Sequence, residues 1–410
     1  MSSHLLRIVL LAASILAAQA PPVETSASPA PQSIAPPAAV DAGDYIYISG
    51  QSGRRPDGTV PDSFEEQASQ ALENIKAVAQ SFRLDLDHIV YMQVYLQDVS
   101  NSQKFNHVLA KYFPANPPAG AILGVSRVPQ SSIQMNAVAV RDISGRKPVL
   151  PSNHKSAEPF SPGILTRDRL FISAMQGRDP VTKIVPNDPA AQTDLALDGF
   201  KAVVETAGLT LAHVVFVNPY LTEKVPSRVM NERYARRFEF GNTPARATIE
   251  VHALPDAAQI EYTGVAVRDL RQRRAVRPKN MPPSPTASPC VFAGETLYCS
   301  AKSGFIPGPH GGVYGPTTAA QVRQTMRNQL DNLEEADMNF SQVVSTTIYL
   351  DDLADDDAFD KVYSEYFSGT FPAQTVVQQR PSDNRSADPQ GHYPDLEQMS
   401  LIAIKSRPKK

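Results

Sequence analysis

One set of short motifs occurs three times in the same order along the chain. An apolar run that ends in or just beyond a serine appears as Tyr45–Gln51, Leu170–Met175 and Leu297–Lys302. Three further markers follow each run: a Tyr-Leu pair at residues 95, 220 and 349, a Pro-Ala pair at 118, 244 and 372, and a closing apolar strand at 137–142, 264–269 and 401–405. This order predicts three copies of one domain, with a period of roughly 125 residues that is too long for a solenoid.

Each copy carries the pattern of an α+β domain. In copy one, apolar residues at helical spacing over residues 68–82 predict a helix, and Ser63 with Glu66 forms a capping box at its start. A strand is expected from His88 to Leu96 and a second helix from Ser102 to Phe113, between an opening and a closing hairpin. We therefore expect a mixed β-sheet with two helices on one face. The bare face would pack against the other copies, which gives a pseudo-trimer within one chain.

The expected boundaries are 31–147, 148–275 and 276–410 for the three copies. Residues 1–20 are typical of a secretory signal peptide, with an apolar run followed by an Ala-Gln-Ala cleavage site that ends at Ala20. Residues 21–30 are expected to be a linker rich in proline and alanine. The mature protein is thus predicted to be secreted or periplasmic and to carry no membrane span.

Composition argues against several classes of partner. The 410 residues are 42% hydrophobic and 20% charged with a net charge of −3, which provides no electrostatic footprint for nucleic acid. The eight histidines and two cysteines show no ligand spacing, so we expect no metal and no cofactor. Cys290 and Cys299 flank a predicted turn at Gly294-Glu295 symmetrically. They would face each other across a hairpin, and we predict a disulfide between them.

The stretch from Thr243 to Pro255 differs most between copies. It reads as a turn and a strand that forms a β-hairpin with Ile260–Val267, turning near Pro255. In that register one face carries Arg246, Thr248, Glu250, Glu261 and Thr263. The guanidinium of Arg246 is suited to binding a carboxylate. The alternative for Arg246 is a structural ion pair with Glu250 or Glu261.

Together these motifs closely resemble those of the RidA/YjgF family of imine deaminases. The motifs are Ser49-Gly-Gln51, the helix around Ala71–Ile75, Tyr95–Asp98, Tyr112-Phe-Pro114 and Pro244–Val251. The resemblance implies chorismate-mutase-like domains with ligand clefts between subunits. It also implies hydrolysis of 2-imino acids or their enamine tautomers to 2-oxo acids and ammonia, without metal or cofactor.

Position by position, the resemblance places the family's site residues mainly on copy two. The carboxylate-binding arginine falls on Arg246, and Gly120 and Gln374 stand there in copies one and three. The glutamate thought to position water falls on Glu261, against Gln134 and Gln398. The family's tyrosine is Phe160, its serine-glycine pair is Ser173-Ala174, and its cleft asparagine is Asn231, matched by Asn106 and Asp360.

We therefore expect one retained deaminase-like cleft, anchored by Arg246 with Glu261 as the second catalytic residue. Ser173, Ala174, Phe160 and Asn231 would complete the substrate-binding residues. The expected partner is a small carboxylate or imino acid, bound by a monomer with internal pseudo-symmetry. The alternatives are a non-catalytic protein that binds small carboxylates or another partner, and, with less support, an endoribonuclease.

Overall fold

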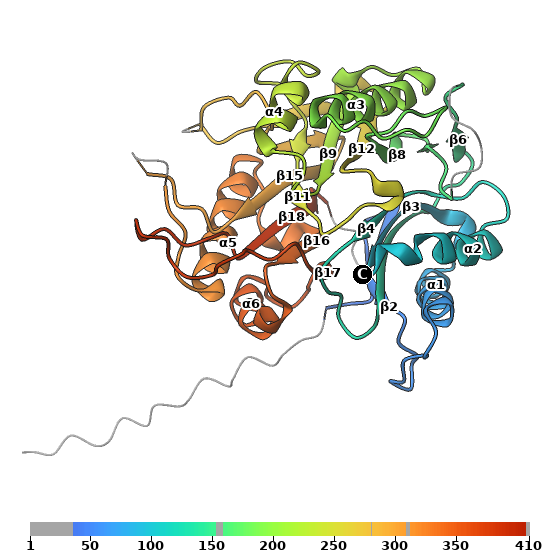
Figure 1. Ribbon diagram of the computed structural model, residues 1–410, viewed down its shortest axis with the longest axis horizontal. Helices are drawn as coiled ribbons and strands as arrows, with labels where there is room; N and C mark the ends of the chain where they lie inside the picture. The colour runs from blue at the N-terminus through green and yellow to red at the C-terminus, as the bar shows by residue number, and fades with distance from the viewer. Residues whose placement is uncertain (1–35, 153–158, 280, 309–311, 407–410) are drawn as a thin grey trace, which may run out of the picture. The chain divides into compact units, whose positions relative to one another are not determined.

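The structure is a computed structural model that describes residues 36–152, 159–279, 281–308 and 312–406. The predicted signal peptide, the linker and the cleavage site at Ala20 lie outside the described residues. The part from Ala35 onward is one compact unit, in which three sheets each carry two long helices (Figure 1). The three tandem α+β copies are confirmed.

Copy one contains two strands, a helix, a strand, a second helix and two more strands. These are β1 (Ala39–Asp41), β2 (Tyr45–Ser52), α1 (Phe64–Ser81), β3 (Ile89–Leu96), α2 (Ser102–Tyr112), β4 (Ala119–Gly124) and β5 (Ile133–Val140). The strand order is β1-β2-β5-β3-β4. The helix starts as expected after Ser63, whose side chain accepts a hydrogen bond from the backbone N–H of Glu66; the return bond of the predicted capping box is not among the described hydrogen bonds.

Copies two and three repeat this plan with an added edge strand each. Copy two has β6 (Lys147–Val149), β7 (Gly163–Leu165), β8 (Arg169–Gln176), α3 (Pro189–Thr206), β9 (Val214–Leu221), α4 (Ser227–Ala235), β10 (Ala245–Arg246), β11 (Ile249–Glu250) and β12 (Ile260–Val267). Copy three has β13 (Arg273–Val276), β14 (Cys290–Ala293), β15 (Thr296–Ser303), α5 (Thr318–Glu335), β16 (Val343–Leu350), α6 (Asp356–Tyr363), β17 (Ala373–Gln378) and β18 (Glu397–Ile404). The expected boundaries, after residues 147 and 275, fall inside β6 and β13. These two short strands pair with β7 and β14, so each belongs to the sheet of the copy that follows it.

The predicted closing hairpin is wrong. Strands β10 and β11 pair in parallel with β9, whereas β12 pairs antiparallel with both β8 and β9. The connection is not a tight turn, because a 3₁₀ helix (Pro255–Ala257) intervenes and Asp256 and Ala257 have positive φ angles. In the sheet, β9 lies between β10 and β12, the two strands that the sequence pattern predicts to be adjacent.

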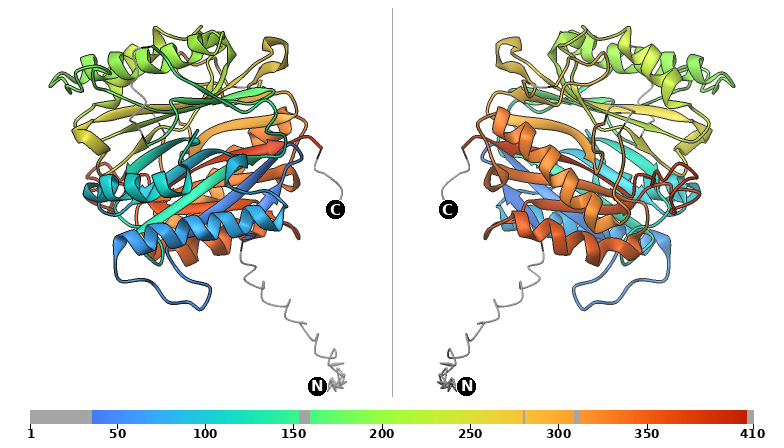
Figure 2. Two further views of the ribbon diagram at one scale, coloured as in Figure 1. Left: turned by 90° about the vertical axis from the view of Figure 1, so that its right-hand side faces the viewer. Right: turned by 90° about the vertical axis from the view of Figure 1, so that its left-hand side faces the viewer.

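The helices cover one face of each sheet, and the other faces pack against one another (Figure 2). Two buried apolar clusters draw residues from all three sheets, including Tyr47, Val90, Phe171, Phe216 and Tyr298 in one of them. The tyrosines of the repeated Tyr-Leu pairs meet in the other, where the hydroxyls of Tyr95 and Tyr349 lie 3.2 Å apart. The sheet faces thus stabilise one another, and the intrachain pseudo-trimer is confirmed.

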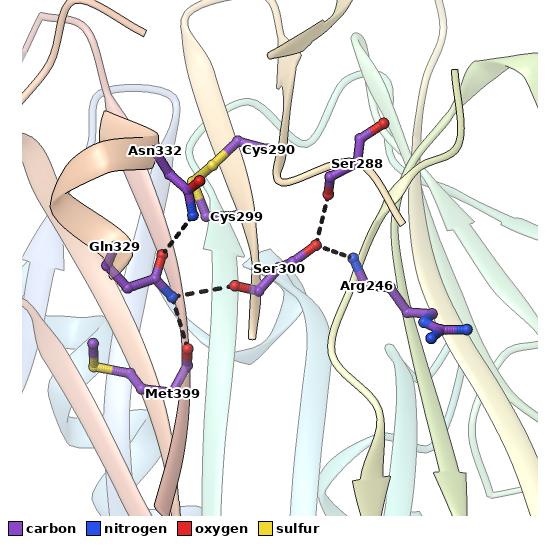
Figure 3. The surroundings of a disulfide bond; sticks show 8 residues. All are labelled: Arg246, Ser288, Cys290, Cys299, Ser300, Gln329, Asn332 and Met399. Carbon is purple, nitrogen blue, oxygen red and sulfur yellow. Dashed lines mark hydrogen bonds between the residues drawn. A yellow bond between two sulfur atoms is a disulfide. The ribbon is translucent and has the colours of Figure 1, made fainter. Parts of the chain in front are cut away.

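The predicted disulfide is also confirmed. Cys290 on β14 faces Cys299 on β15, and their Cα atoms lie 4.0 Å apart. Both residues are fully buried in the core of copy three. Figure 3 shows the bond beside Asn332 and close to the seam between copies two and three.

Candidate ligand clefts between the copies

Each copy meets the next through the same hydrogen bond, from a backbone N–H to a serine Oγ. The three bonds run from Gly120 to Ser173, from Arg246 to Ser300 and from Gln374 to Ser49, with N···O distances of 2.8, 2.8 and 3.0 Å. The residue that donates stands at the position predicted for the carboxylate-binding arginine. The serine belongs to the predicted serine-glycine pair of the following copy. Each cleft is therefore built from two copies, in cyclic order.

Arg246 lies at the seam between copies two and three, and its described partners are uncharged. Its Nη1 donates to Asn231 Oδ1 at 2.8 Å and contacts Met230 Sδ at 3.7 Å, and the guanidinium lies 5.1 Å from the ring centroid of Tyr234. Burial lowers the pKa of Arg246, and Tyr234 and Tyr262 partly offset that effect. Figure 3 shows the Arg246 backbone held by Ser300, with its side chain directed away from the serine.

The alternative of a structural ion pair for Arg246 finds no support among the described residues. Glu250 pairs instead with Arg380, at 2.9 Å. Glu261 belongs to a different cleft, described next. Within the described ranges Arg246 makes no salt bridge with a carboxylate. A largely buried guanidinium without a counter-charge is costly, and an anion beside it would offset that cost.

Glu261 lines a cavity of about 500 Å³ between copies one and two. Copy one contributes Asn106 and Gly120 to its wall. Copy two contributes most of the rest, including Phe160, Ser173, Ala174 and Glu261. The predicted site residues are therefore distributed over two clefts, with Arg246 and Asn231 in one and the other four in the other.

The cause of this separation is the cyclic packing. A cleft combines the Pro-Ala strand of one copy with the serine strand and the final strand of the next. Glu261 aligns with Gln176 on β8, and Gln398 aligns with Ser303 on β15 in the same way. The Arg246 cleft thus has an amide, Gln398, at the position of the carboxyl group that lines the other cleft.

Burial disfavours the ionised form of Glu261. Its side chain is about 1% exposed, and burial raises its pKa to about 8. Asp256 raises the pKa further, whereas Gln176 and Arg178 lower it. Among the described residues neither carboxyl oxygen has a partner within hydrogen-bond geometry. A neutral carboxyl group can donate a proton or a hydrogen bond, and it can ionise when a cation approaches.

The Glu261 cleft cannot hold an arginine at the equivalent position without rearrangement. A Cβ atom on Gly120 would lie 2.6 Å from the Phe160 ring and 2.7 Å from the Met92 carbonyl oxygen. The aromatic ring thus occupies the space in which a side chain from β4 would begin. This cleft presents an apolar wall in place of a guanidinium.

The seam between copies three and one carries no cation at the arginine position, which is occupied by Gln374. Gln374 donates a long hydrogen bond, 3.4 Å, to Asp360, the counterpart of Asn231. Burial and the nearby carboxylates of Asp360 and Asp357 raise the pKa of Asp356 to about 6. Carboxylates at this seam oppose the binding of a second anion.

Two arginines reach the clefts without a motif that would reveal them. Arg178 follows β8 and pairs with Asp256 at 2.9 Å beside Glu261. Arg380 belongs to the polar stretch 379–395 and ties copy three to Glu223 and Glu250 of copy two. Only the fold brings these partners together. The described residues contain no cluster that could hold a metal ion and no helix long and apolar enough to cross a membrane.

Comparison with known proteins gives matches to each copy. The family model described as "Endoribonuclease L-PSP" matches residues 28–141, 151–268 and 280–383. Protein MMF1, mitochondrial, of Saccharomyces cerevisiae is 35% identical over 124 residues, which are 28% of this chain and 86% of that protein. A RutC family protein of Saccharolobus solfataricus is 42% identical over 93 residues, 22% of this chain and 74% of that protein.

Solved structures of similar sequence each cover about a quarter of this chain. The structure of yeast Mmf1 is 33% identical, covers 28% of this chain and 98% of its own, and has a TM-score of 0.25. The structure of Escherichia coli TdcF with bound serine is 30% identical, covers 27% of this chain and 91% of its own, and has a TM-score of 0.26.

Proposed function

The chain belongs to the RidA/YjgF family in all three of its copies, and we propose that it binds a small carboxylate through Arg246, in the cleft between copies two and three. The ligand class is a 2-imino acid or the corresponding 2-oxo acid. The observation that carries the proposal is the buried guanidinium whose described partners are all neutral. A carboxylate supplies the missing counter-charge.

The geometry around Arg246 favours a directed contact with the ligand. Asn231 takes one N–H of the guanidinium, at Nη1, and the backbone of Arg246 is fixed by Ser300. The other N–H groups of the guanidinium can donate two parallel bonds to one carboxylate. Because the arginine is held in place before the ligand arrives, little side-chain entropy is lost on binding.

The reaction that such binding would serve is hydrolysis of a 2-imino acid. Water adds to the imine carbon, the C–N bond breaks, and the products are a 2-oxo acid and ammonia. The catalyst needs to hold the carboxylate, orient the water and accept its proton. At this cleft the residue aligned with Glu261 is Gln398, which can hold a water molecule but cannot accept a proton. We therefore expect slow hydrolysis, or carboxylate binding without turnover.

An assay on freshly generated 2-imino acids separates these outcomes. Ammonia and 2-oxo acid are measured for the wild-type protein, Arg246→Ala and Gln398→Glu. The Gln398→Glu variant places a carboxyl group at the position of the family's glutamate, in the cleft that holds Arg246. It should raise the rate above wild type, and combining it with Arg246→Ala should abolish that gain. A gain that survives the loss of Arg246 would contradict the proposed anchor.

A further inference from the structure

The cavity lined by Glu261 differs in chemistry from the surroundings of Arg246. It lies at another seam from Arg246, its volume is about 500 Å³, and no guanidinium stands at the β4 position. Cavities of this size commonly bind small organic molecules. The polar groups on its wall therefore decide which class of molecule fits.

The buried polar atoms without a described partner in this wall are all oxygens. Both carboxyl oxygens of Glu261, Oδ1 of Asn106 and Oε1 of Gln176 have no partner among the described residues, and all three residues line the cavity. Buried oxygens that lack a partner are costly, and N–H groups of a ligand would supply one. Ser173 is already satisfied, because it accepts from Gly120 and donates to Ser161.

The charges around the cavity favour a cation. Arg178 is neutralised by Asp256, and Asp198 pairs with Arg237 at 2.6 Å. Lys183 lines the cavity from an exposed position on the surface. Glu261 is the buried ionisable residue of the wall for which no ion pair is described. An ammonium group beside it would restore balance once the carboxyl ionises.

We propose that the cavity between copies one and two binds a primary amine with an apolar body, whose ammonium group is held by Glu261 and Asn106. Phe160 and the neighbouring prolines and aliphatic side chains receive the apolar part. Binding releases a proton: the ligand arrives as an ammonium ion, and the Glu261 carboxyl gives its proton to the solvent as the ion pair forms.

Isothermal titration calorimetry with three ligands of one shape tests the proposal. Benzylamine is cationic at pH 7, benzyl alcohol is neutral and benzoate is anionic. Benzylamine should bind this cavity at least tenfold more tightly than benzyl alcohol. Titration in buffers of different ionisation enthalpy should show release of close to one proton per benzylamine at pH 7. Binding without proton release, or equal affinity for the amine and the alcohol, would overturn the proposal.

Two variants assign the effect to Glu261. Glu261→Gln keeps the side-chain shape and should lower the affinity for benzylamine at least tenfold, while leaving benzyl alcohol unaffected. Glu397→Gln is the matched control, because Glu397 is equally buried and also has a pKa of about 8, but is hydrogen-bonded to Thr325 and does not line this cavity. If both variants lose the amine equally, or if neither does, the assignment to Glu261 is wrong. The outcome is independent of Arg246, which serves a different cleft.

Discussion

Arg246 is partly buried and Glu261 is fully buried, with opposite consequences for their charge at neutral pH. Burial lowers the pKa of Arg246, yet a guanidinium starts so high that it remains protonated. Burial raises the pKa of Glu261 to about 8, so its carboxyl is mostly neutral at pH 7. One residue therefore presents a fixed charge to a ligand, and the other presents a charge that a ligand can induce.

Replacement of Glu261 should change how stability depends on pH. Its pKa is about 8 in the folded protein, against an ordinary value of 4.5. The folded state therefore binds the proton more tightly, and this contribution to stability is present below about pH 4.5 and lost as pH rises through 8. A glutamine does not ionise, so Glu261→Gln should not lose stability as the pH rises through 8. At pH 9 the variant should therefore have a larger free energy of unfolding than wild type, by a few kcal/mol at most.

Thermal unfolding at pH 5, 7 and 9 checks this expectation. The difference in Tm between Glu261→Gln and wild type should grow with pH. A difference that stays constant across the three pH values would mean that Glu261 is already ionised in the folded protein at pH 5.

Strand β4 is sensitive to any added side chain at Gly120. The Cβ of Gly120→Ala would lie within 2.8 Å of both the Phe160 ring and the Met92 carbonyl oxygen. Overpacking of this kind costs about 1–3 kcal/mol. Chemical denaturation should show the loss. Gly199→Ala in α3 is the control, because its Cβ meets Met175 only at an ordinary contact distance of 3.4 Å, and it should not destabilise the protein.

The hairpin of β14 and β15 is cross-linked within a short loop. The cysteines are nine residues apart, and closing a loop of that length restricts the unfolded chain by about 2–3 kcal/mol in the chain-entropy account. The double variant Cys290→Ala/Cys299→Ala should lower the free energy of unfolding by at least this amount, because two buried sulfur atoms are also lost. A double variant as stable as wild type would show that the bond is not formed in the protein as isolated.

At the scale of the whole molecule, the repeat predicted more than any single motif did. The repeated motifs predicted three copies and their mutual burial, and the apolar spacing over residues 68–82 predicted the first helix of copy one. The pairing of β10 with β9 could not be predicted from the sequence pattern. Parallel strands are joined by a long connection, so no turn motif between them marks the pair. The distribution of Arg246 and Glu261 over two clefts depends on which copy follows which around the pseudo-three-fold axis. Arg178 and Arg380 reach their partners only through that packing.

The closed arrangement of three copies predicts that the chain needs no further copies of itself. The three sheet faces that would be exposed in a single domain are buried within one chain. Light scattering on the protein from residue 21 onward should therefore give the mass of one chain. A trimer of chains at low micromolar concentration would contradict this expectation.

Counting carboxylate sites tests most directly the claim that Arg246 is the anchor. Calorimetric titration with pyruvate or 2-oxobutyrate should give one site per chain. Arg246→Ala should lose nearly all of the affinity, a cost of about 2–5 kcal/mol, and Arg246→Lys should lose much of it because an ammonium cannot make the paired contact. Gln374→Ala, at the same position in copy three, should bind like wild type. Three equivalent sites, or one site that survives Arg246→Ala, would show that Arg246 has a structural role and that carboxylates bind elsewhere.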